Sequence, residues 1–327
     1  MTRAQQMRLF GWWCKLNVVG GFARPGQLAM RQFLTPPKAR FTPKQEAFLA
    51  SARRSTLPFE GHTLAVYEWG PEDAPYLYTA YGYGYNAGRW RHFAPAFVEA
   101  GYRVIAYDYV GHGNSSRDLV DYPLIVRTQE FILRTFGRPE FALLHSFGAG
   151  TFIEVAAQLP EALWPTRVAL LAPFSDAYYI FRQYADALGF GESLFNSLTQ
   201  AIQARTGRDV YSFDLAAAAT RLGDLPALIV HDPADPVTNY SNARRIHAHW
   251  PGSHLLPAPN AGHGIASSEA TAAIQGWLMH ADLPAHAIRS SATEHLAEQL
   301  EHPLERWFRP VAQVSAYADG DGTYYRQ

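Results

Sequence analysis

The stretch Phe141-Ala-Leu-Leu-His-Ser-Phe-Gly-Ala-Gly150 decides the fold of this chain and indicates its chemistry. An apolar run typical of a buried strand leads directly into Ser146, and small residues follow before a helical pattern begins. Such a sharp turn needs small neighbours and holds the serine hydroxyl above the sheet, where helix N–H groups favour developing negative charge. The simpler alternative is that Ser146 only caps the helix, which is common for serine.

From residue 63 onward, short strand patterns alternate with longer helical patterns. Because such alternation produces parallel sheets that are covered by helices, we predict an α/β fold with a mostly parallel central sheet and helices on both faces. The expected strands are 63–69, 76–81, 103–108, 141–144, 167–171, 227–231 and 254–258, and the expected helices are 90–100, 123–135, 150–159, 240–249 and 267–280.

Residues 174–224 break this alternation, because they contain two helical patterns and no strand pattern. An insertion between two core strands lies at the edge where the strands end, so we predict a helical lid there. The expected organisation is an N-terminal arm at 1–57, a core at 58–173 and 225–285, the lid at 174–224, and a C-terminal helix and tail at 286–327, with the helix near 291–300.

Two more segments place chemistry-bearing residues after strands. The turn His231-Asp-Pro-Ala-Asp235 follows one strand pattern, and the loop Asn260-Ala-Gly-His-Gly264 follows the last one. The chain order is therefore Ser, Asp, His, each after a different strand. With these motifs and the Gly-x-Gly turn after Asp108, the sequence resembles the α/β-hydrolase superfamily, in particular its esterase-like members with a helical cap, over roughly residues 58–278.

The resemblance implies a catalytic triad. In it Ser146 is the nucleophile, His263 is the general base, and Asp235 orients the imidazole. Two other acids stay open, namely Asp232 in the same turn and Asp176 after the preceding strand. We favour Asp235 because the family's acid usually lies a few residues beyond the strand end and is followed closely by a valine.

The loop Tyr81-Gly-Tyr-Gly-Tyr-Asn-Ala-Gly-Arg-Trp90 is similar to the oxyanion loop of that family. The resemblance implies that the backbone N–H groups of Tyr83 and Phe147 form the oxyanion hole. Two residues depart from the family pattern: Tyr81 replaces the usual histidine, and Leu144 stands two positions before the serine, where a small residue is preferred.

Aromatic residues near these motifs predict an apolar substrate pocket. The residues expected to contact substrate are Tyr85, Trp90, Phe174 and Tyr178. We therefore predict a serine hydrolase that cleaves carboxylic esters of apolar or aromatic substrates through an acyl-enzyme. Cleavage of C–C bonds, lactones or amides by the same triad, a perhydrolase side activity, and a non-catalytic ligand-binding protein remain alternatives.

Composition excludes several other functions. The chain has 28 Lys and Arg against 29 Asp and Glu, and without a basic run we expect no attraction to nucleic acids or anionic lipids. No Cys/His spacing of a zinc module is present, and the glycines at 82, 84 and 88 do not fit a dinucleotide-binding fingerprint. We expect neither a metal nor a cofactor.

The apolar segment at 9–23 is interrupted by Lys15 and Asn17 and is too short to span a bilayer. We expect a cytoplasmic protein without an integral membrane span, whose N-terminal arm packs on the main domain. The alternatives are a membrane-surface contact or a homodimer, formed through Leu9, Phe10, Trp12 and Trp13.

Overall fold

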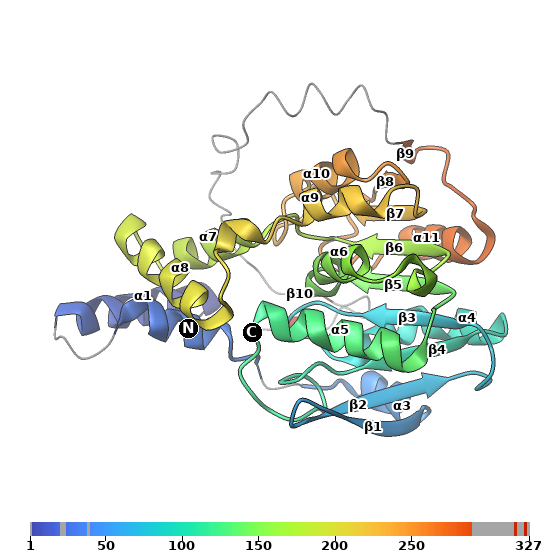
Figure 1. Ribbon diagram of the computed structural model, residues 1–327, viewed down its shortest axis with the longest axis horizontal. Helices are drawn as coiled ribbons and strands as arrows, with labels where there is room; N and C mark the ends of the chain where they lie inside the picture. Colours follow the sequence, from blue (N-terminus) through green and yellow to red (C-terminus); the bar gives the residue numbers. More distant parts are fainter. Residues whose placement is uncertain (1, 20–23, 38–39, 290–316, 319–323, 326–327) are drawn as a thin grey trace.

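A nine-stranded sheet forms the centre of the computed structural model, which describes residues 2–19, 24–37, 40–289, 317–318 and 324–325 (Figure 1). The strand order is β1-β2-β4-β3-β5-β6-β7-β8-β9. Strands β4, β3, β5, β6, β7 and β8 are parallel, while β1, β2 and β9 pair antiparallel at the edges. The strands are β1 (Arg53–Phe59), β2 (His62–Trp69), β3 (Tyr76–Ala80), β4 (Arg103–Tyr107), β5 (Phe141–His145), β6 (Arg167–Leu171), β7 (Ala227–His231), β8 (Ser253–Pro257) and β9 (Ile288–Arg289).

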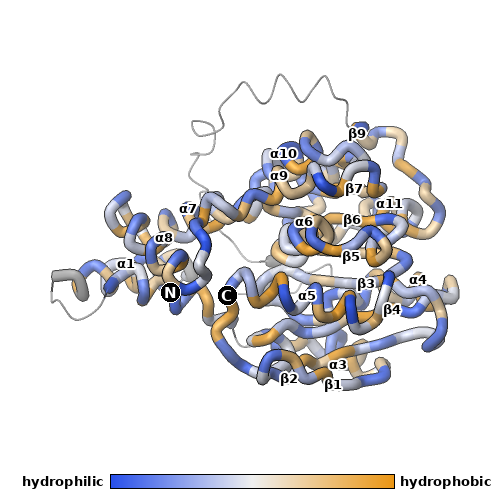
Figure 2. The backbone as a smooth tube through the Cα atoms, viewed as in Figure 1, coloured by the Kyte–Doolittle hydropathy of each residue, from blue (hydrophilic) through white to orange (hydrophobic). Residues whose placement is uncertain are grey.

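The central strands β5 to β7 consist mainly of hydrophobic residues, which Figure 2 colours orange. Every residue of β5 and β7 is buried. A strand of this kind is stable only where helices cover the sheet on both sides. The predicted fold class, a mostly parallel sheet between two helical layers, is confirmed.

The crossovers determine which face each helix covers. In the sheet, the connection from β3 to β4 runs toward β1, whereas the connections from β4 to β5, from β5 to β6 and from β7 to β8 run the opposite way. Because crossovers between parallel strands are right-handed, α4 lies on the opposite face of the sheet from α5, α6 and α10. Helix α11 packs against β6 and β7. These helices are α4 (Ala94–Glu99), α5 (Tyr122–Phe136), α6 (Phe147–Gln158), α10 (Ser241–His249) and α11 (Ser268–His280), and short 3-10 turns are η1 (Ala87–His92) and η2 (Glu161–Leu163).

A helical insertion joins β6 to β7. It contains α7 (Ala177–Ala187), α8 (Glu192–Thr206), η3 (Val210–Ser212), α9 (Leu215–Ala219) and η4 (Thr220–Leu222). Helix α2 (Pro25–Phe33) packs backbone to backbone on α8, since a Cβ on Gly26 would lie 2.1 Å from the Ser197 carbonyl oxygen. The N-terminal segment and the insertion therefore pack together beside the sheet (Figure 1).

Two strands cross the domain boundaries that the sequence predicts. The N-terminal segment holds α1 (Arg3–Val19), α2 and α3 (Pro43–Ala50), but β1 begins at Arg53 and pairs with β2, before the predicted start of the core at residue 58. Strand β9 lies in the predicted tail and pairs with β8. The helix predicted near 291–300 lies outside the described residues. Two short strands, β10 (Tyr317–Ala318) and β11 (Tyr324–Tyr325), pair with each other.

Candidate active site

Ser146 occupies a strained turn between β5 and α6. Its φ of 49° and ψ of −116° form a combination that residues with side chains rarely adopt, and such strain gathers at functional sites. The turn brings α6 very close to β3, because a Cβ on Gly148 would lie 2.6 Å from the carbonyl oxygens of Ala80 and Tyr81. Only glycine fits at position 148. Leu144, the departure from the family pattern, is fully buried in β5 between β3 and β6.

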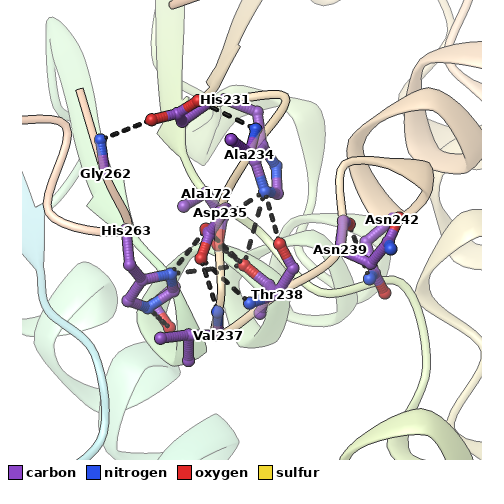
Figure 3. Close-up of polar contacts among 12 residues, drawn as sticks. Ala172, His231, Ala234, Asp235, Val237, Thr238, Asn239, Asn242, Gly262 and His263 are labelled. Atoms are coloured by element: carbon purple, nitrogen blue, oxygen red, sulfur yellow. Dashed lines mark hydrogen bonds and ion pairs between the residues drawn. The ribbon is translucent and has the colours of Figure 1, made fainter. Parts of the chain in front are cut away.

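Three predicted residues form one hydrogen-bonded chain. His263 Nε2 lies 3.0 Å from Ser146 Oγ, and His263 Nδ1 lies 2.8 Å from Asp235 Oδ2. Asp235 follows β7 and His263 follows β8, so three separate strand ends supply the three side chains. Figure 3 shows the imidazole of His263 facing the Asp235 carboxylate.

The surroundings of Asp235 fix the tautomer of His263. Burial alone would raise the pKa of Asp235, but hydrogen bonds from His231 and His263 outweigh it and hold that pKa well below its ordinary range. The carboxylate is therefore ionised and can only accept, so His263 Nδ1 carries the proton. His263 Nε2 is then the acceptor of the Ser146 hydroxyl proton, as a general base requires.

Two further side chains support the carboxylate, and the sequence motifs did not reveal them. Thr238 Oγ1 donates to Asp235 Oδ2 over 2.9 Å, and His231 Nε2 lies 3.2 Å from the same oxygen (Figure 3). The other oxygen accepts from the backbone N–H of Val237 at 2.7 Å. These contacts depend on how the turn after β7 folds, and residue spacing alone carries no signal for them.

The two alternative acids make other contacts. Asp232 accepts hydrogen bonds from the backbone N–H groups of Gly262 at 2.7 Å and Ala234 at 2.9 Å, so it ties the His263 loop to the Asp235 turn. Asp176 caps α7 and forms an ion pair with Arg245 at 3.0 Å. Of the three acids, Asp235 is the one that the structure places on the imidazole of His263.

A second histidine lies directly behind the site. His145 is wholly buried, and its Nε2–H donates to the backbone carbonyl of His263 over 3.0 Å. Burial, together with the positive charge of Arg89, lowers the pKa of His145 well below its ordinary value. A neutral His145 thus fixes the backbone of His263. No sequence motif indicated this role for His145.

The two predicted oxyanion donors flank the serine. A Cβ on Gly82 would lie 3.0 Å from the Cβ of Ser146, so the loop that carries Tyr83 passes directly beside the hydroxyl. Phe147 is the first residue of α6 and follows Ser146. Within the described part of the chain, no hydrogen bond engages the backbone N–H of Tyr83 or of Phe147. Both donors are available to a ligand.

His112, in the turn after β4, supports the predicted oxyanion loop. Its Nδ1–H donates to the Val110 carbonyl oxygen, and its Nε2 accepts from the Gly84 N–H, both over 3.0 Å. Burial lowers its pKa to about 4, which keeps the ring neutral and Nε2 an acceptor at neutral pH. No sequence motif indicated this contact with the loop.

An apolar pocket lies beside the serine turn. It is walled by α2, α7 and α8 and by Tyr83 and Phe147, the two predicted oxyanion donors. The predicted contact residue Phe174 stacks on Phe147 with ring centroids 5.6 Å apart. The lining residues of the pocket are Met30, Phe33, Leu34, Tyr83, Val120, Asp121, Tyr122, Phe147, Phe174, Ala177, Ile180, Phe181, Ile202, Arg205, Thr206 and Phe213.

The other predicted contact residues do not line this pocket. Trp90 is wholly buried and packs edge to face on Phe93 in the core, so it lies out of reach of a ligand. Tyr178 stacks on Tyr211 at the outer side of the insertion. Tyr85 lines a separate, more polar pocket. Its liners also include Arg89 and Gly264, and the Arg89 guanidinium donates to the Gly264 carbonyl oxygen over 2.6 Å.

The part of the chain that the structure describes contains no group of three or more His, Cys, Asp or Glu side chains placed to hold a metal ion. The titratable groups that gather around Ser146 are instead linked to one another by hydrogen bonds. The arrangement can remove a proton from a hydroxyl and can stabilise negative charge beside it.

Comparisons with known proteins agree with this geometry. Residues 82–275, more than half of the chain, match the model of the alpha/beta hydrolase family. Epoxide hydrolase A of Mycobacterium tuberculosis is 46% identical over 57 residues, which cover 17% of this chain and 18% of that protein. The bifunctional esterase/perhydrolase of Acinetobacter calcoaceticus is 33% identical over 58 residues, 18% of this chain and 21% of that protein. The chain thus matches only about a fifth of the length of these curated relatives.

Solved structures share the fold at low sequence identity. The thioesterase domain from a curacin biosynthetic pathway superimposes with a TM-score of 0.52 at 16% identity, covering 70% of this chain and 99% of that one. A hydrolase from Pseudomonas aeruginosa gives a TM-score of 0.52 at 21% identity, covering 69% and 97%. Together with the strand order and the serine turn, the family match shows that the chain belongs to the alpha/beta hydrolase family.

Proposed function

We propose that this hydrolase cleaves carboxylic esters of apolar or aromatic substrates through an acyl-enzyme on Ser146. The single observation that carries the proposal is the hydrogen-bonded chain from Ser146 through His263 to Asp235, which provides a nucleophile, a base and an orienting acid. Its nucleophile, Ser146, lies at the carboxyl end of β5 next to β3, where the crossovers leave in opposite directions and where ligands bind in sheets of this kind.

The contacts define the proton path. Ser146 Oγ attacks the ester carbonyl carbon while its proton moves to His263 Nε2. The carbonyl oxygen becomes an oxyanion and accepts from the Tyr83 and Phe147 N–H groups. When the C–O bond breaks, the departing alkoxide takes the proton from His263 and leaves as an alcohol. Water then attacks the acyl carbon, gives its proton to His263, and the acid leaves as the proton returns to Ser146.

The apolar pocket supports the substrate class. Its walls are formed mainly by aliphatic and aromatic side chains, so burial of an apolar acyl or aryl group is favoured. Helices α7 and α8 form part of these walls, which supports a role as a lid that excludes water from the acyl-enzyme. The names of the short matches, an epoxide hydrolase and an esterase/perhydrolase, describe those proteins and agree with hydrolysis in general.

Hydrolysis of p-nitrophenyl esters of increasing acyl length tests the proposal. The wild-type chain is expected to turn over the apolar esters, and Ser146→Ala is expected to abolish that turnover. Undiminished esterase activity in Ser146→Ala would contradict the proposal. A parallel panel of amides, lactones, diketones and epoxides distinguishes the ester class from its alternatives. If the chain cleaves one of these compounds in preference to every ester, that compound class replaces esters as the proposed substrate.

A further inference from the structure

Helix α1 presents an apolar stripe to solvent. Its exposed fractions are 52% for Leu9, 60% for Trp12, 47% for Trp13 and 47% for Leu16. These positions follow one another at i, i+3, i+4 and i+7, so the four side chains share one face of the helix. An exposed apolar patch rimmed by polar residues marks an interaction site on most proteins.

The opposite face of α1 is already occupied. Gly11 and Cys14 are buried, and a Cβ on Gly11 would lie 1.9 Å from the Leu188 carbonyl oxygen at the end of α7. Lys15 Nζ donates to the Gly189 carbonyl oxygen over 2.6 Å. Because the inner face is seated backbone to backbone on the insertion, α1 cannot rotate to bury the stripe within the molecule. Figure 1 shows α1 beside α7 and α8, away from the sheet.

The charge of the N-terminal segment is strongly one-sided, which the net charge of −1 conceals. The first 45 residues contain eight Lys or Arg residues and no Asp or Glu, whereas the remainder carries 20 basic and 29 acidic residues. Among the described cations, Arg8 and Lys15 on α1 and Arg24 and Arg31 next to or on α2 are exposed. The expectation from net charge, that nothing attracts anionic lipids, therefore does not hold for this segment.

We propose that α1 docks on the surface of an anionic lipid bilayer, with the stripe Leu9, Trp12, Trp13 and Leu16 in the interface. Exposed tryptophan and leucine side chains on a helix that carries Arg8 and Lys15 and no acidic residue suit the headgroup region of an anionic bilayer. No helix among the described residues is long or apolar enough to cross a bilayer, so α1 lies on the surface. A two-fold contact between copies would instead bring identical cations together.

The position of α1 links the docking surface to the apolar pocket. Helix α1 packs on α2 and α7, and these two helices supply Met30, Phe33, Ile180 and Phe181 to the pocket wall. Lipid docking would thus place the pocket next to the bilayer. Docking itself does not depend on the proposed hydrolysis, so its test is independent of catalysis.

Flotation of the full chain with vesicles tests the proposal. The chain is expected to float with vesicles of phosphatidylcholine mixed with phosphatidylglycerol and far less with phosphatidylcholine alone, and binding should weaken as salt rises. The double variant Trp12→Ser with Leu16→Ser should lower the apparent affinity by roughly tenfold or more. Arg8→Glu should weaken binding to anionic vesicles and leave the residual binding to phosphatidylcholine unchanged.

Matched controls keep the result interpretable. Ile288→Ser removes another exposed apolar residue, on β9 far from α1, and should bind like the wild type. Ser146→Ala should also bind like the wild type, so failure of the catalytic proposal is distinguishable. Circular dichroism shows whether each variant folds. The proposal is overturned if folded wild-type protein does not float with anionic vesicles, if the stripe variant floats unchanged, or if sedimentation shows a lipid-free dimer that the stripe variant abolishes.

Discussion

The hydroxyl of Tyr81 donates a hydrogen bond to Oδ1 of Asp108 over 3.0 Å, and both side chains are wholly buried. The same hydroxyl accepts from the Tyr109 N–H at 3.1 Å, and Asp108 also accepts from the Ala87 and Asn114 N–H groups at 2.8 Å. The tyrosine that replaces the family's usual histidine therefore joins the predicted oxyanion loop to the turn after β4.

Tyr81→Phe tests this connection. It leaves the Tyr109 N–H without its acceptor and removes one donor from a buried carboxylate, so we expect a loss of about 1–3 kcal/mol in the free energy of unfolding. We also expect kcat to fall roughly tenfold, less than the loss of an oxyanion donor itself. Urea unfolding and ester kinetics measure both. Tyr76→Phe is the control, because Tyr76 donates to the Gly137 carbonyl oxygen away from the site and should affect stability alone.

Asp235→Asn tests the choice of the acid. An amide at this position cannot hold the proton of His263 on Nδ1, so kcat should drop by roughly 10⁴-fold, the effect of the same change in a serine protease triad. Asp176→Asn should leave kcat within a few-fold, because Asp176 pairs with Arg245 instead. A large loss in Asp176→Asn with little effect in Asp235→Asn would reverse the assignment.

Gly148→Ala tests the serine turn. The added Cβ would meet two carbonyl oxygens at 2.6 Å, so the turn must shift, and we expect a loss of about 1–3 kcal/mol in stability and a sharp decrease in kcat. Gly191→Ala is the matched control, since a Cβ there has nothing within 4 Å and its φ of −83° suits alanine. Equal effects of the two substitutions on kcat would show that the turn is not tightly packed.

Phe174→Ala tests the pocket. Removal of the ring enlarges the space beside Phe147, so the preferred acyl length of the substrate should shift toward longer chains. Tyr178→Ala removes an aromatic ring that lies outside the pocket and should leave the length preference unchanged. The measurement is kcat/KM across the ester series. An unchanged length preference in Phe174→Ala would contradict the proposal that this pocket binds the acyl group.

The stability of the protein should fall on acidification, partly through His112. This buried ring has a pKa of about 4, below the ordinary value of 6.5, so the unfolded chain binds a proton at a higher pH than the folded chain does. The free energy of unfolding should therefore decrease as the pH falls from about 6.5 to 4, by about 3 kcal/mol at pH 4 from this group. His112→Gln should show a shallower decrease in pH-dependent urea unfolding. An identical slope in the two proteins would contradict the assignment.

The serine turn and the strand ends were predictable because their signals are local. The apolar runs of β5 and β7 require burial on both faces, and Gly148 marks a close approach of backbones. Strand β1 was not predictable, because most of its residues are exposed and only pairing with β2 makes it a strand. The position of Trp90 in the core was not predictable either, because an indole is accommodated equally well by the core and by an apolar pocket.

The supporting shell of the site could not be predicted for a related reason. Thr238 and His231 contact Asp235 within the turn after β7, and these contacts depend on the detailed fold of that turn. Asp232 joins this turn to the His263 loop, about 30 residues away in sequence, so its contact exists only after the two segments have folded against each other. The net charge of the whole chain also gave no sign of the basic N-terminal segment, because the acidic residues of the remainder offset its charge. A count of charged residues by region reveals it.

The central claim, that Ser146 is an activated nucleophile, is tested most directly by covalent labelling. The folded chain is treated with a fluorophosphonate, digested, and mapped by mass spectrometry. We predict one adduct, on the peptide that contains Ser146, with no adduct in Ser146→Ala and much slower labelling in Asp235→Asn. An unlabelled wild-type protein, or an adduct that persists in Ser146→Ala, would contradict the account.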